Sequence, residues 1–536
     1  MGATVAAMAL FCALPARPLA SSTQETVIQD DVQLIYSSPA RVAQQLQRIA
    51  SLGVDRIRVS VVWSLVAPNA DSTRRPQFDA KDPAAYPAGA WDRYDTIVHL
   101  AAQLGIRVDF QLSPPAPAWA VNSSDGTAGY SWSRDPSAAL YRDFVTAVGL
   151  RYSGTYVAKI PRSEPQLPIL GILPVLGSPP ATPGTSEVIP RVDYWEIWNE
   201  PNEASWLNPV TRQVGRRQIL VAPVLYRGLA AAAESALASS GHGGDTILFG
   251  ETASFAPIEP AAFVQAMYCL NSADRPLRGQ RAKDLLCSPS GDPSQFLAQH
   301  PELFLFSGYA HHPYQFDVPP SAAPGRPTDV TLSDLPRFER ALDGVFRAYG
   351  RLPPGGMPIY LSEWGYKTNP PNPYVKTSTA QQAVWLNQGE YMAWRDPRVR
   401  LLGQFLLVDD GPRTSAPVGS RKYWGTFQTG LLYLDGRPKP AYASFRIPIW
   451  LPNARHGRRV TVWGQLRPAD HSSSQSATLE FRPEGSRTWR PVRSIQTASP
   501  EGFLLAHVSI PGPGSVRLAW FGPAGAVYRS RTVGVR

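Results

Sequence analysis

Two short apolar segments of this chain each end on a glutamate. Residues 195–200 read WEIWNE and end at Glu200, and residues 359–363 read IYLSE and end at Glu363. Each segment has the composition of a buried β-strand, in which a charged side chain is rare unless it is paired. Two such strands suggest two carboxyl groups that face one cavity. Paired carboxylates perform glycoside hydrolysis, in which one group gives and takes a proton while the other attacks the sugar or activates water.

The two glutamates need opposite charge states for this chemistry. Glu200 has to hold a proton for the leaving oxygen, whereas Glu363 has to stay ionised to attack the anomeric carbon. Taken singly, each has a simpler explanation. Glu200 precedes Pro201 and could begin a helix, and Glu363 could be an ordinary salt-bridge partner. The occurrence of both segments in one chain favours a shared site.

Strand-like and helix-like segments alternate along most of the chain. Apolar runs predict strands at 32–36, 56–61, 107–112, 193–198, 246–250, 303–310, 358–361 and 401–408, with amphipathic helical windows between them. Eight strands that alternate with helices predict an α/β fold, a (β/α)8 TIM barrel, over residues 32–447. Glu200 then ends the fourth strand and Glu363 the seventh, at the face of the barrel where ligands bind.

The sequence around both glutamates resembles a known family. Trp198-Asn199-Glu200-Pro201 resembles the acid/base strand of clan A glycoside hydrolases, and Ser362-Glu363-Trp364-Gly365 resembles the nucleophile strand of the same clan. Within the clan the chain resembles families 39 and 5 and their bacterial cellulase-like members. The resemblance implies a retaining glycoside hydrolase that cleaves O-glycosidic bonds of an oligo- or polysaccharide by double displacement, with Glu200 as acid/base and Glu363 as nucleophile.

The same resemblance assigns roles to residues on neighbouring strands. Asn199 matches an amide that binds the sugar 2-hydroxyl, and Arg58 matches an arginine that supports the nucleophile, although Arg56 faces the same side by strand alternation. His312 and Tyr314 match a His-x-Tyr pattern: His312 would bond substrate or the acid, and Tyr314 would donate to Glu363. Since no third ligand stands at metal spacing around the histidines, we expect neither a metal nor a cofactor.

Further candidates for sugar contact lie at or beyond strand ends. They are Trp63, Gln111, Trp119, Trp132 and Trp206. For each tryptophan, packing in the core is the simpler alternative. Clan members often carry a tryptophan at the end of the eighth strand, but here that strand reads LLVDD over residues 406–410. Trp424 in the following loop could replace it, or Asp409 or Asp410 could bond sugar hydroxyls directly.

The pattern of the sequence changes near residue 448. Short alternating runs at 459–466, 477–481, 503–510 and 515–520 predict a small all-β, sandwich-like domain over residues 449–536. Of the net charge of +10, residues 446–536 carry +9, from 13 arginines and 4 acids. This domain is therefore predicted to meet an anionic wall polymer or membrane surface, unless the arginines are simply solvated. With no recognition motif present, nucleic-acid binding is not expected.

The start of the chain is typical of an export signal. An apolar run over residues 5–14 precedes Pro18-Leu19-Ala20-Ser21, so residues 1–20 are predicted to be a signal peptide and the protein to be secreted or cell-surface; a frayed terminal segment is the alternative. Outside it no run reaches the length of a membrane span. In an oxidising compartment Cys269 and Cys287 are expected to form a disulfide rather than remain unpaired thiols.

Two other classes of function remain open at this stage. One is a barrel that binds carbohydrate without cleaving it, and the other is a cell-surface adhesion protein whose C-terminal module is the active part. The presence of both glutamates disfavours the first. The sequence leaves the sugar, the linkage and the mode of attack open, because long loops decide them.

Overall fold

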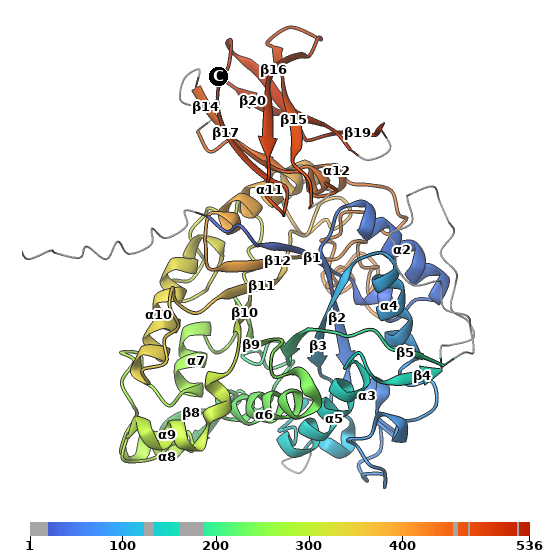
Figure 1. The fold of residues 1–536 in the computed structure, drawn as a ribbon. Helices are drawn as coiled ribbons and strands as arrows, with labels where there is room; N and C mark the ends of the chain where they lie inside the picture. The colour runs from blue at the N-terminus through green and yellow to red at the C-terminus, as the bar shows by residue number, and fades with distance from the viewer. Residues whose placement is uncertain (1–19, 123–132, 160–185, 454–458, 470–471, 523–524) are drawn as a thin grey trace, which may run out of the picture.

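The computed structural model describes residues 20–122, 133–159, 186–453, 459–469, 472–522 and 525–536. The predicted signal peptide, apart from its last residue, lies outside the described residues, and so does Trp132. Within the described part, parallel strands close into a barrel in the order β1-β12-β11-β10-β9-β6-β3-β2 (Figure 1). No helix in this part of the chain has the length and apolar character needed to cross a bilayer. The predicted TIM barrel is confirmed.

The barrel strands run through buried, largely apolar sequence. Their bounds are β1 (Glu25–Gln29), β2 (Arg56–Val62), β3 (Arg107–Ser113), β6 (Tyr194–Ile197), β9 (Thr246–Ala253), β10 (Gly308–His312), β11 (Ile359–Trp364) and β12 (Val399–Phe405). Two two-stranded antiparallel sheets lie outside the barrel: β4 (Val157–Lys159) with β5 (Ser186–Val188), and β7 (Thr211–Val214) with β8 (Arg217–Leu220).

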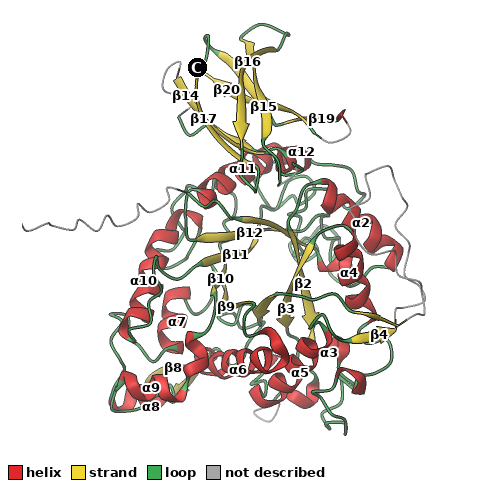
Figure 2. Cartoon of the chain, in the orientation of Figure 1, coloured by secondary structure: helices red, strands yellow, loops and turns green. Residues whose placement is uncertain are grey.

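Helices surround the barrel, as Figure 2 shows. They are α1 (Asp31–Leu34), α2 (Pro39–Ser51), α3 (Trp63–Val66), α4 (Asp92–Gln103), α5 (Ala138–Arg151), α6 (Ala222–Leu237), α7 (Pro260–Met267), α8 (Gly279–Asp284), α9 (Pro293–Gln299), α10 (Leu335–Ala348), α11 (Thr379–Trp394) and α12 (Pro440–Arg446). Local sequence sets their starts. Ser38 caps α2 with proline in the first turn, and Ser378 and Gln381 form a capping box on α11.

The prediction of the first strand at 32–36 is wrong. Residues 25–29 (ETVIQ) form β1, so the barrel begins before residue 32, and the predicted segment overlaps α1 and the turn after it. The cause is Asp30, whose carboxylate accepts from the backbone N–H of Gln33 and so caps α1. The same carboxylate accepts from Leu407 and Val408 after β12, which joins the two ends of the barrel sheet. Because Glu25 and Gln29 at the two ends of β1 are polar, the segment has too few apolar residues to be predicted as a buried strand.

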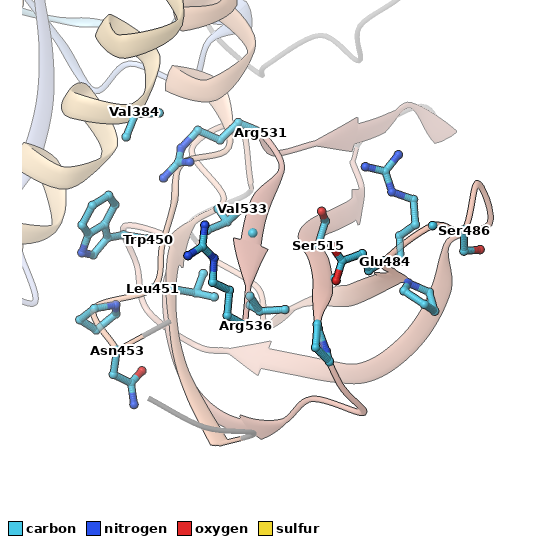
Figure 3. A pocket seen from close by; sticks show the side chains of 18 residues that line it. Val384, Trp450, Leu451, Asn453, Glu484, Ser486, Ser515, Arg531, Val533 and Arg536 are labelled. Carbon is cyan, nitrogen blue, oxygen red and sulfur yellow. The ribbon is translucent and has the colours of Figure 1, made fainter. Parts of the chain in front are cut away.

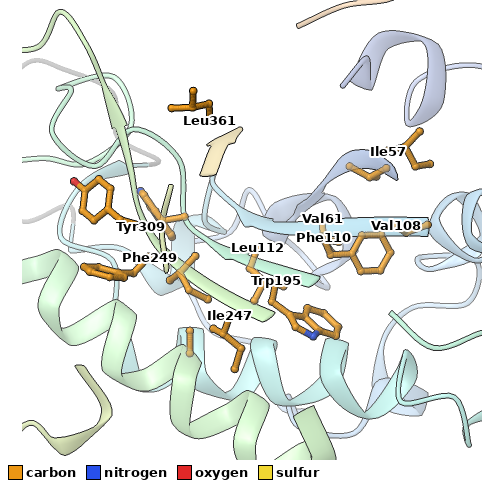
Figure 4. Close-up of a cluster of buried hydrophobic side chains, with 14 of the residues drawn as sticks. Ile57, Val61, Val108, Phe110, Leu112, Trp195, Ile247, Phe249, Tyr309 and Leu361 are labelled. Atoms are coloured by element: carbon orange, nitrogen blue, oxygen red, sulfur yellow. The ribbon is translucent and has the colours of Figure 1, made fainter. Parts of the chain in front are cut away.

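Strand alternation divides the barrel residues into two sets. One set points outward and packs under the helices; Figure 4 shows members of it, among them Ile57, Phe110, Trp195 and Phe249. The other set points inward, where a small apolar layer is made by Val27, Leu248, Ala310, Tyr360 and Leu401. Above and between these, the barrel interior holds buried charged side chains, which is uncommon and requires each to be paired.

The C-terminal region folds as antiparallel sheets around its own core, as predicted. One sheet holds β13 (Ile449–Trp450), β14 (Arg459–Gln465) and β17 (Phe503–Ser509). The other holds β15 (Gln475–Pro483), β16 (Arg490–Thr497), β18 (Gly514–Phe521), β19 (Val527–Arg529) and β20 (Val533–Val535). Their core includes Val462, Leu479 and Trp520. An open cavity of about 1060 Å³ lies beside these sheets, with Trp450, Arg531 and Arg536 in its lining (Figure 3).

A buried arginine attaches this module to the barrel. Arg467 bonds the Glu390 carboxylate of α11 at 2.8 Å, Thr26 of β1 at 3.1 Å and the carbonyl of Phe445. The backbone of Arg467 also lies against Gly53, where an added Cβ would meet it at 2.2 Å. Gly53 precedes β2, so the contact is made near the amino-terminal ends of the strands, the end opposite to the one that carries Glu200.

A disulfide joins Cys269 and Cys287, as predicted. It ties the end of α7 to the segment after α8, on the outside of the barrel. The bond closes the segment of the chain that contains α8.

Gly389 is needed where α11 packs on the strand that carries Glu363. An added Cβ there would meet the Trp364 ring at 2.1 Å, so Gly389→Ala is expected to destabilise the protein by about 1–3 kcal/mol through overpacking. Gly228, in the middle of α6, is the control: its nearest neighbour would be 3.6 Å away, and Gly228→Ala should stabilise by about 0.5–1 kcal/mol through helix propensity. Denaturant unfolding of both variants measures this. Equal effects of the same sign would contradict the packing.

Candidate active site

The structure brings the two predicted glutamates together. Glu200 lies three residues beyond the end of β6, and Glu363 lies near the end of β11; these are the fourth and seventh barrel strands in chain order. One carboxylate oxygen of each and one ring nitrogen of His312 lie within 4.8 Å of one another. This upper limit for one pair of oxygens is compatible with the about 5–5.5 Å between the carboxyl groups of retaining enzymes and lies below the about 6.5–9.5 Å of inverting enzymes.

The backbone before Glu200 is strained. Trp198 has φ +69° and Glu200 has φ +38°, in the left-handed region that side chains other than glycine rarely adopt. Such residues cluster at functional sites, where the surrounding packing holds them. Here Trp198 is fully buried and its indole N–H donates to the Trp206 carbonyl, which fixes the turn that presents Glu200.

Arg58 of β2 is the hub of the barrel interior. It is fully buried and hydrogen-bonds Glu363 at 2.6 Å. Its other nitrogens bond Glu196 and Glu251, and it also bonds Gln29 of β1. Burial would lower the pKa of this guanidinium, but the carboxylates outweigh burial and hold its pKa well above the ordinary value. The structure therefore supports Arg58, rather than Arg56, next to Glu363.

Arg56 serves a different part of the barrel. It bonds Glu25 at 2.8 Å and Asp193 at 3.0 Å, one alternation below Arg58. Asp109 and Glu196 are buried between the two arginines. Burial raises the pKa of Asp109 to about 6 and that of Glu196 well above its usual range. Glu196 is thus a structural carboxylate below the site.

His312 and Tyr314 both contact the glutamate pair. The His312 ring places Nδ1 at 2.9 Å from Glu200 and 3.7 Å from Glu363. The Tyr314 hydroxyl donates to Glu363 at 3.2 Å. Glu363 thus receives bonds from Arg58 and Tyr314, whereas Glu200 is held by His312. His311, by contrast, points outward to Thr252 and the Val330 carbonyl, and burial lowers its pKa to about 4.

An amide relay supports Asn199. Gln111 of β3 donates to Asn199 Oδ1 at 2.7 Å and accepts from the Ser60 hydroxyl at 2.9 Å. Ser60 belongs to β2, so two adjacent strands orient the residue before Glu200. Because Oδ1 of Asn199 is already engaged, its amide N–H group is the part that remains for a ligand. Gln111 and Asn199 both line the cavity.

A cavity of about 620 Å³ opens above these groups. Its lining includes Glu200, Glu363, Asn199, Gln111, Tyr314 and Asp410 from the sequence predictions. Aromatic side chains form much of its wall: Tyr36, Trp206, Phe255, Phe316, Phe405 and Phe427. The additional acids are Asp31, Glu203 and Asp410, and among the described residues that line the cavity none is arginine or lysine.

Three of the predicted sugar-contact residues, Trp63, Trp119 and Trp424, are not among the described residues that line the cavity. Trp63 is 1% exposed and stacks on Phe144 at 5.4 Å between ring centroids, so it packs in the core because it begins α3 on the outer side of the barrel. Trp424 lies in the loop after β12 against Tyr423 and is not among the described cavity residues. Trp119, also buried, is a core residue like Trp63.

The segment after β12 carries other residues where clan members often have a tryptophan. Asp409 is buried in an ion pair with Lys439 at 2.7 Å and so is a structural residue. Asp410 faces the cavity and accepts from the Phe427 backbone at 3.0 Å. Phe405 and Phe427, whose rings lie edge to face at 5.1 Å, occupy the wall here in place of a tryptophan.

Glu251 is a functional-site residue that sequence reasoning missed. It lies wholly buried in β9, one residue beyond the predicted strand, and contacts Arg58, His312 and Ser362. Simple alternation from inward-facing Leu248 places Glu251 on the outer face. A register shift of β9 against β10 between Ala310 and His311 skips Glu251 and turns it inward. The acidic residue after Gly250 is the only trace of this in the sequence.

Two carboxylates and an imidazole are also ligand types found in metal sites. Here both ring nitrogens of His312 face carboxylate oxygens, at 2.9 Å for Glu200 and 3.0 Å for Glu251. Glu251 is ionised and only accepts, so Nε2 donates to it, and Nδ1 is engaged in its hydrogen bond with Glu200, which leaves no ring lone pair free for an ion. The arrangement fits acid–base chemistry better than metal binding.

Comparison with known proteins finds no match to a protein-family model and none to a curated protein. Solved structures that are similar include a monomeric β-xylosidase from Caulobacter crescentus, at 14% identity and TM-score 0.45, covering 92% of this chain and 97% of that one. A family 1 β-glucosidase from Thermotoga maritima matches at 13% identity and TM-score 0.44, over 76% and 85%. An endo-β-1,4-mannanase from Thermotoga petrophila matches at 13% and 0.37, over 96% and 98%. At this level of similarity, function rests on the geometry of the site.

Removal of Arg58 should lower the free energy of unfolding by an amount that depends on pH. Arg58→Met leaves Glu196, Glu251 and Glu363 buried without their cation, and we expect a loss of about 3–5 kcal/mol in unfolding free energy at about pH 8. Burial raises the pKa of Glu251, but Arg58 and other donors outweigh burial and lower this pKa to about 2. A lowered glutamate pKa stabilises the folded protein above the ordinary glutamate pKa, and this stabilisation is lost as the pH falls toward 2. The deficit should therefore shrink at about pH 4.

The matched control is Arg151→Met. Arg151 forms a buried pair with the single carboxylate of Asp95, on α4 and outside the barrel interior. Its loss should be smaller and should change less between the two pH values, because one carboxylate rather than three is left behind. Urea unfolding at both pH values compares them. Wild-type stability of Arg58→Met would contradict the hub role of Arg58.

Proposed function

We propose that this protein is a retaining glycoside hydrolase that cleaves O-glycosidic bonds of an oligo- or polysaccharide. The observation that carries the proposal is the approach of Glu200 and Glu363 to within 4.8 Å at the ligand-binding end of the barrel, in unlike surroundings. Their places on the fourth and seventh strands support membership of clan A, and the choice among its families is left open. A barrel that only binds carbohydrate has no need of this spacing.

The surroundings assign the two roles. Glu363 is bonded by a guanidinium and a phenol, from Arg58 and Tyr314, which favour an ionised, oriented carboxylate suited to attack. Glu200 is more exposed, at 18% of its side chain, and contacts His312. A more accessible carboxyl at the cavity wall can reach the leaving oxygen and water, as an acid/base must.

The reaction then follows in two displacements. Glu200 gives its proton to the glycosidic oxygen as the bond from that oxygen to the anomeric carbon breaks, and Glu363 forms an ester to the same carbon. Water next enters where the leaving group was. Glu200 takes a proton from the water, the water oxygen bonds the anomeric carbon, and the ester to Glu363 breaks. Asn199 is placed to bond the 2-hydroxyl during both steps.

The lining of the cavity supports an uncharged sugar as substrate. Asp31, Glu203 and Asp410 add acceptors for hydroxyl groups, and Trp206 and Tyr36 offer faces for stacking. A uronic acid would bring a carboxylate beside these acids, with no arginine or lysine among the described lining residues to pair it. We infer that neutral glycans are preferred over acidic ones.

We also propose that the protein acts outside the reducing cytosol. The disulfide between Cys269 and Cys287 supports this, because such bonds persist in oxidising compartments. The predicted signal peptide over residues 1–20 is consistent with export. Cell fractionation of the tagged protein tests it, and retention in the cytosol would contradict it.

Azide rescue tests the assignment of the nucleophile. Glu363→Ala should lose at least about 10⁴-fold in kcat, since the covalent step is removed. Added azide should restore turnover on an activated glycoside and give a glycosyl azide of inverted configuration. Glu200→Ala is the matched control and should give a glycosyl azide of retained configuration. Full activity of Glu363→Ala, or the same azide anomer from both variants, would contradict the roles.

The C-terminal module has a feature that favours a second, binding function. Its edge strand β16 and the turn before it expose Arg487, Arg490 and Arg493, and an exposed arginine row suits an anionic polymer. We propose that this row holds the enzyme on an acidic wall polysaccharide while the barrel acts. The alternative is a solvated basic face without a partner.

Replacement of this row tests the binding function. In the full chain, Arg487→Gln, Arg490→Gln and Arg493→Gln together should weaken binding to polygalacturonate at least about tenfold at low salt and leave kcat unchanged. The charge-matched control replaces the exposed Arg142, Arg212 and Arg216 of the barrel domain with glutamine. Co-sedimentation measures both. Equal binding by the two triple variants would contradict a specific row.

A further inference from the structure

Glu251 is a buried carboxylate that the two-displacement mechanism does not use. It is 0% exposed, has φ +47° and follows Gly250, which has φ +105°. The conformation is held in place by bonds to its two oxygens. Ser362 donates to Oε1 at 3.0 Å, and Oε2 receives Arg58, His312 at 3.0 Å and Gln111 at 3.4 Å. Glu251 is thus a residue that the pairing of β9 with β10 skips, and several donors hold it in a strained backbone conformation. Bulges and strained residues of this kind cluster at functional sites.

His312 links Glu251 to the catalytic pair. Its Nε2 faces Glu251 at 3.0 Å, and its Nδ1 faces Glu200 at 2.9 Å and Glu363 at 3.7 Å. Glu251 is an ionised carboxylate that only accepts hydrogen bonds, so Nε2 carries a proton. A second proton on Nδ1 gives a donor to a Glu200 oxygen, which can accept whether or not Glu200 itself holds a proton. The imidazole is thus arranged as a cation between the buried Glu251 and the two reacting carboxylates.

We propose that Glu251 is a positioning residue that keeps His312 doubly protonated, so that the His312 Nδ1–H remains aimed at Glu200 throughout the reaction. This inference deepens the proposed function, and its catalytic part rests on that function. Glu251 does not line the cavity, so it acts through His312 and not on the substrate.

The consequence for the reaction concerns the charge on Glu200. After Glu200 gives up its proton it is a carboxylate beside the leaving group, and a donating imidazolium stabilises that charge. A neutral ring could instead turn a lone pair toward Glu200 and repel it. The negative charge of Glu251 prevents this by favouring the doubly protonated ring, and Arg58 keeps Glu251 ionised.

The charged groups around His312 agree with this reading. Glu200 after β6, Glu251 of β9 and Glu363 of β11 attract the imidazolium, whereas Arg58 of β2 opposes it; the neighbours His311 and Tyr314 on its own segment complete the surroundings. Burial by itself lowers the pKa of His312, but the three carboxylates raise it to about 10. The folded protein therefore keeps this ring charged well above the pH at which an unfolded histidine loses its proton.

The experiment follows the ring directly in the absence of substrate. The full chain is labelled with ¹³Cε1-histidine, and the His312 signal among the 8 histidines is assigned by its loss in His312→Gln. In the wild type the signal should stay at the imidazolium position up to about pH 9. In Glu251→Gln, which keeps shape but removes the charge, the midpoint should fall by about two pH units or more.

Glu196→Gln is the matched control. Glu196 is equally buried and pairs with the same Arg58, but His312 contacts Glu251 and not Glu196. Its effect on the His312 midpoint should stay below about half a pH unit. An equal shift in both variants would show that any lost carboxylate suffices and would overturn the proposal. If Glu251→Gln does not fold, the wild-type titration still decides, because a His312 midpoint near the ordinary histidine value overturns it.

Activity then gives a second readout. Glu251→Gln should lower kcat at least about tenfold with KM little changed, and its activity should decline at lower pH than the wild type's on the alkaline side, because the ring loses its charge earlier. A stable Glu251→Gln protein with the wild-type pH profile would overturn the catalytic part. A shifted His312 midpoint in a chain that cleaves no glycan would contradict the proposed function and leave the charge assignment standing.

Discussion

A single buried guanidinium organises the interior of this barrel. Arg58 lies on β2 with no exposure to solvent and bonds carboxylates from β6, β9 and β11 together with an amide from β1. Three carboxylates this close together in a buried space would repel one another without it. The distances that matter for chemistry, above all the approach of Glu363 to Glu200, are therefore set by a charge balance and not by apolar packing.

The charged groups, the apolar layer and the C-terminal module occupy different levels along the barrel axis. The apolar layer formed by Val27, Leu248 and Leu401 lies inside the barrel. The charged groups around Arg58 lie toward the carboxyl-terminal ends of the strands, and those around Arg56 lie at the amino-terminal ends. The C-terminal module is attached by Arg467 near the amino-terminal ends, so it can bind elsewhere without blocking the cavity. Under the proposed function, this separation would let the module hold a polymer while the cavity of the barrel stays open to substrate.

The sequence was most informative where a segment was apolar and ended abruptly on a charge. Glu200 and Glu363 were found this way, because the ends of strands carry the information locally. Arg58, His312 and Tyr314 were assigned by the resemblance to clan A, since alternation alone allows Arg56 as well as Arg58. Trp63 was misassigned since a tryptophan near a strand end can turn either inward or into the core, and only the start of α3 decides. The strand β1 was missed because two of its three inward-facing residues, Glu25 and Gln29, are polar partners of Arg56 and Arg58.

Glu251 shows what local patterns do not contain. Its inward direction depends on a register shift between β9 and β10, which arises from the pairing of two strands about 60 residues apart.

The most direct test of the two glutamate roles is covalent trapping by a panel of cyclitol epoxides of differing sugar configuration, read by peptide mass spectrometry. The account predicts one adduct, on the carboxylate of Glu363. An adduct on Glu200 or Glu251 instead would contradict it.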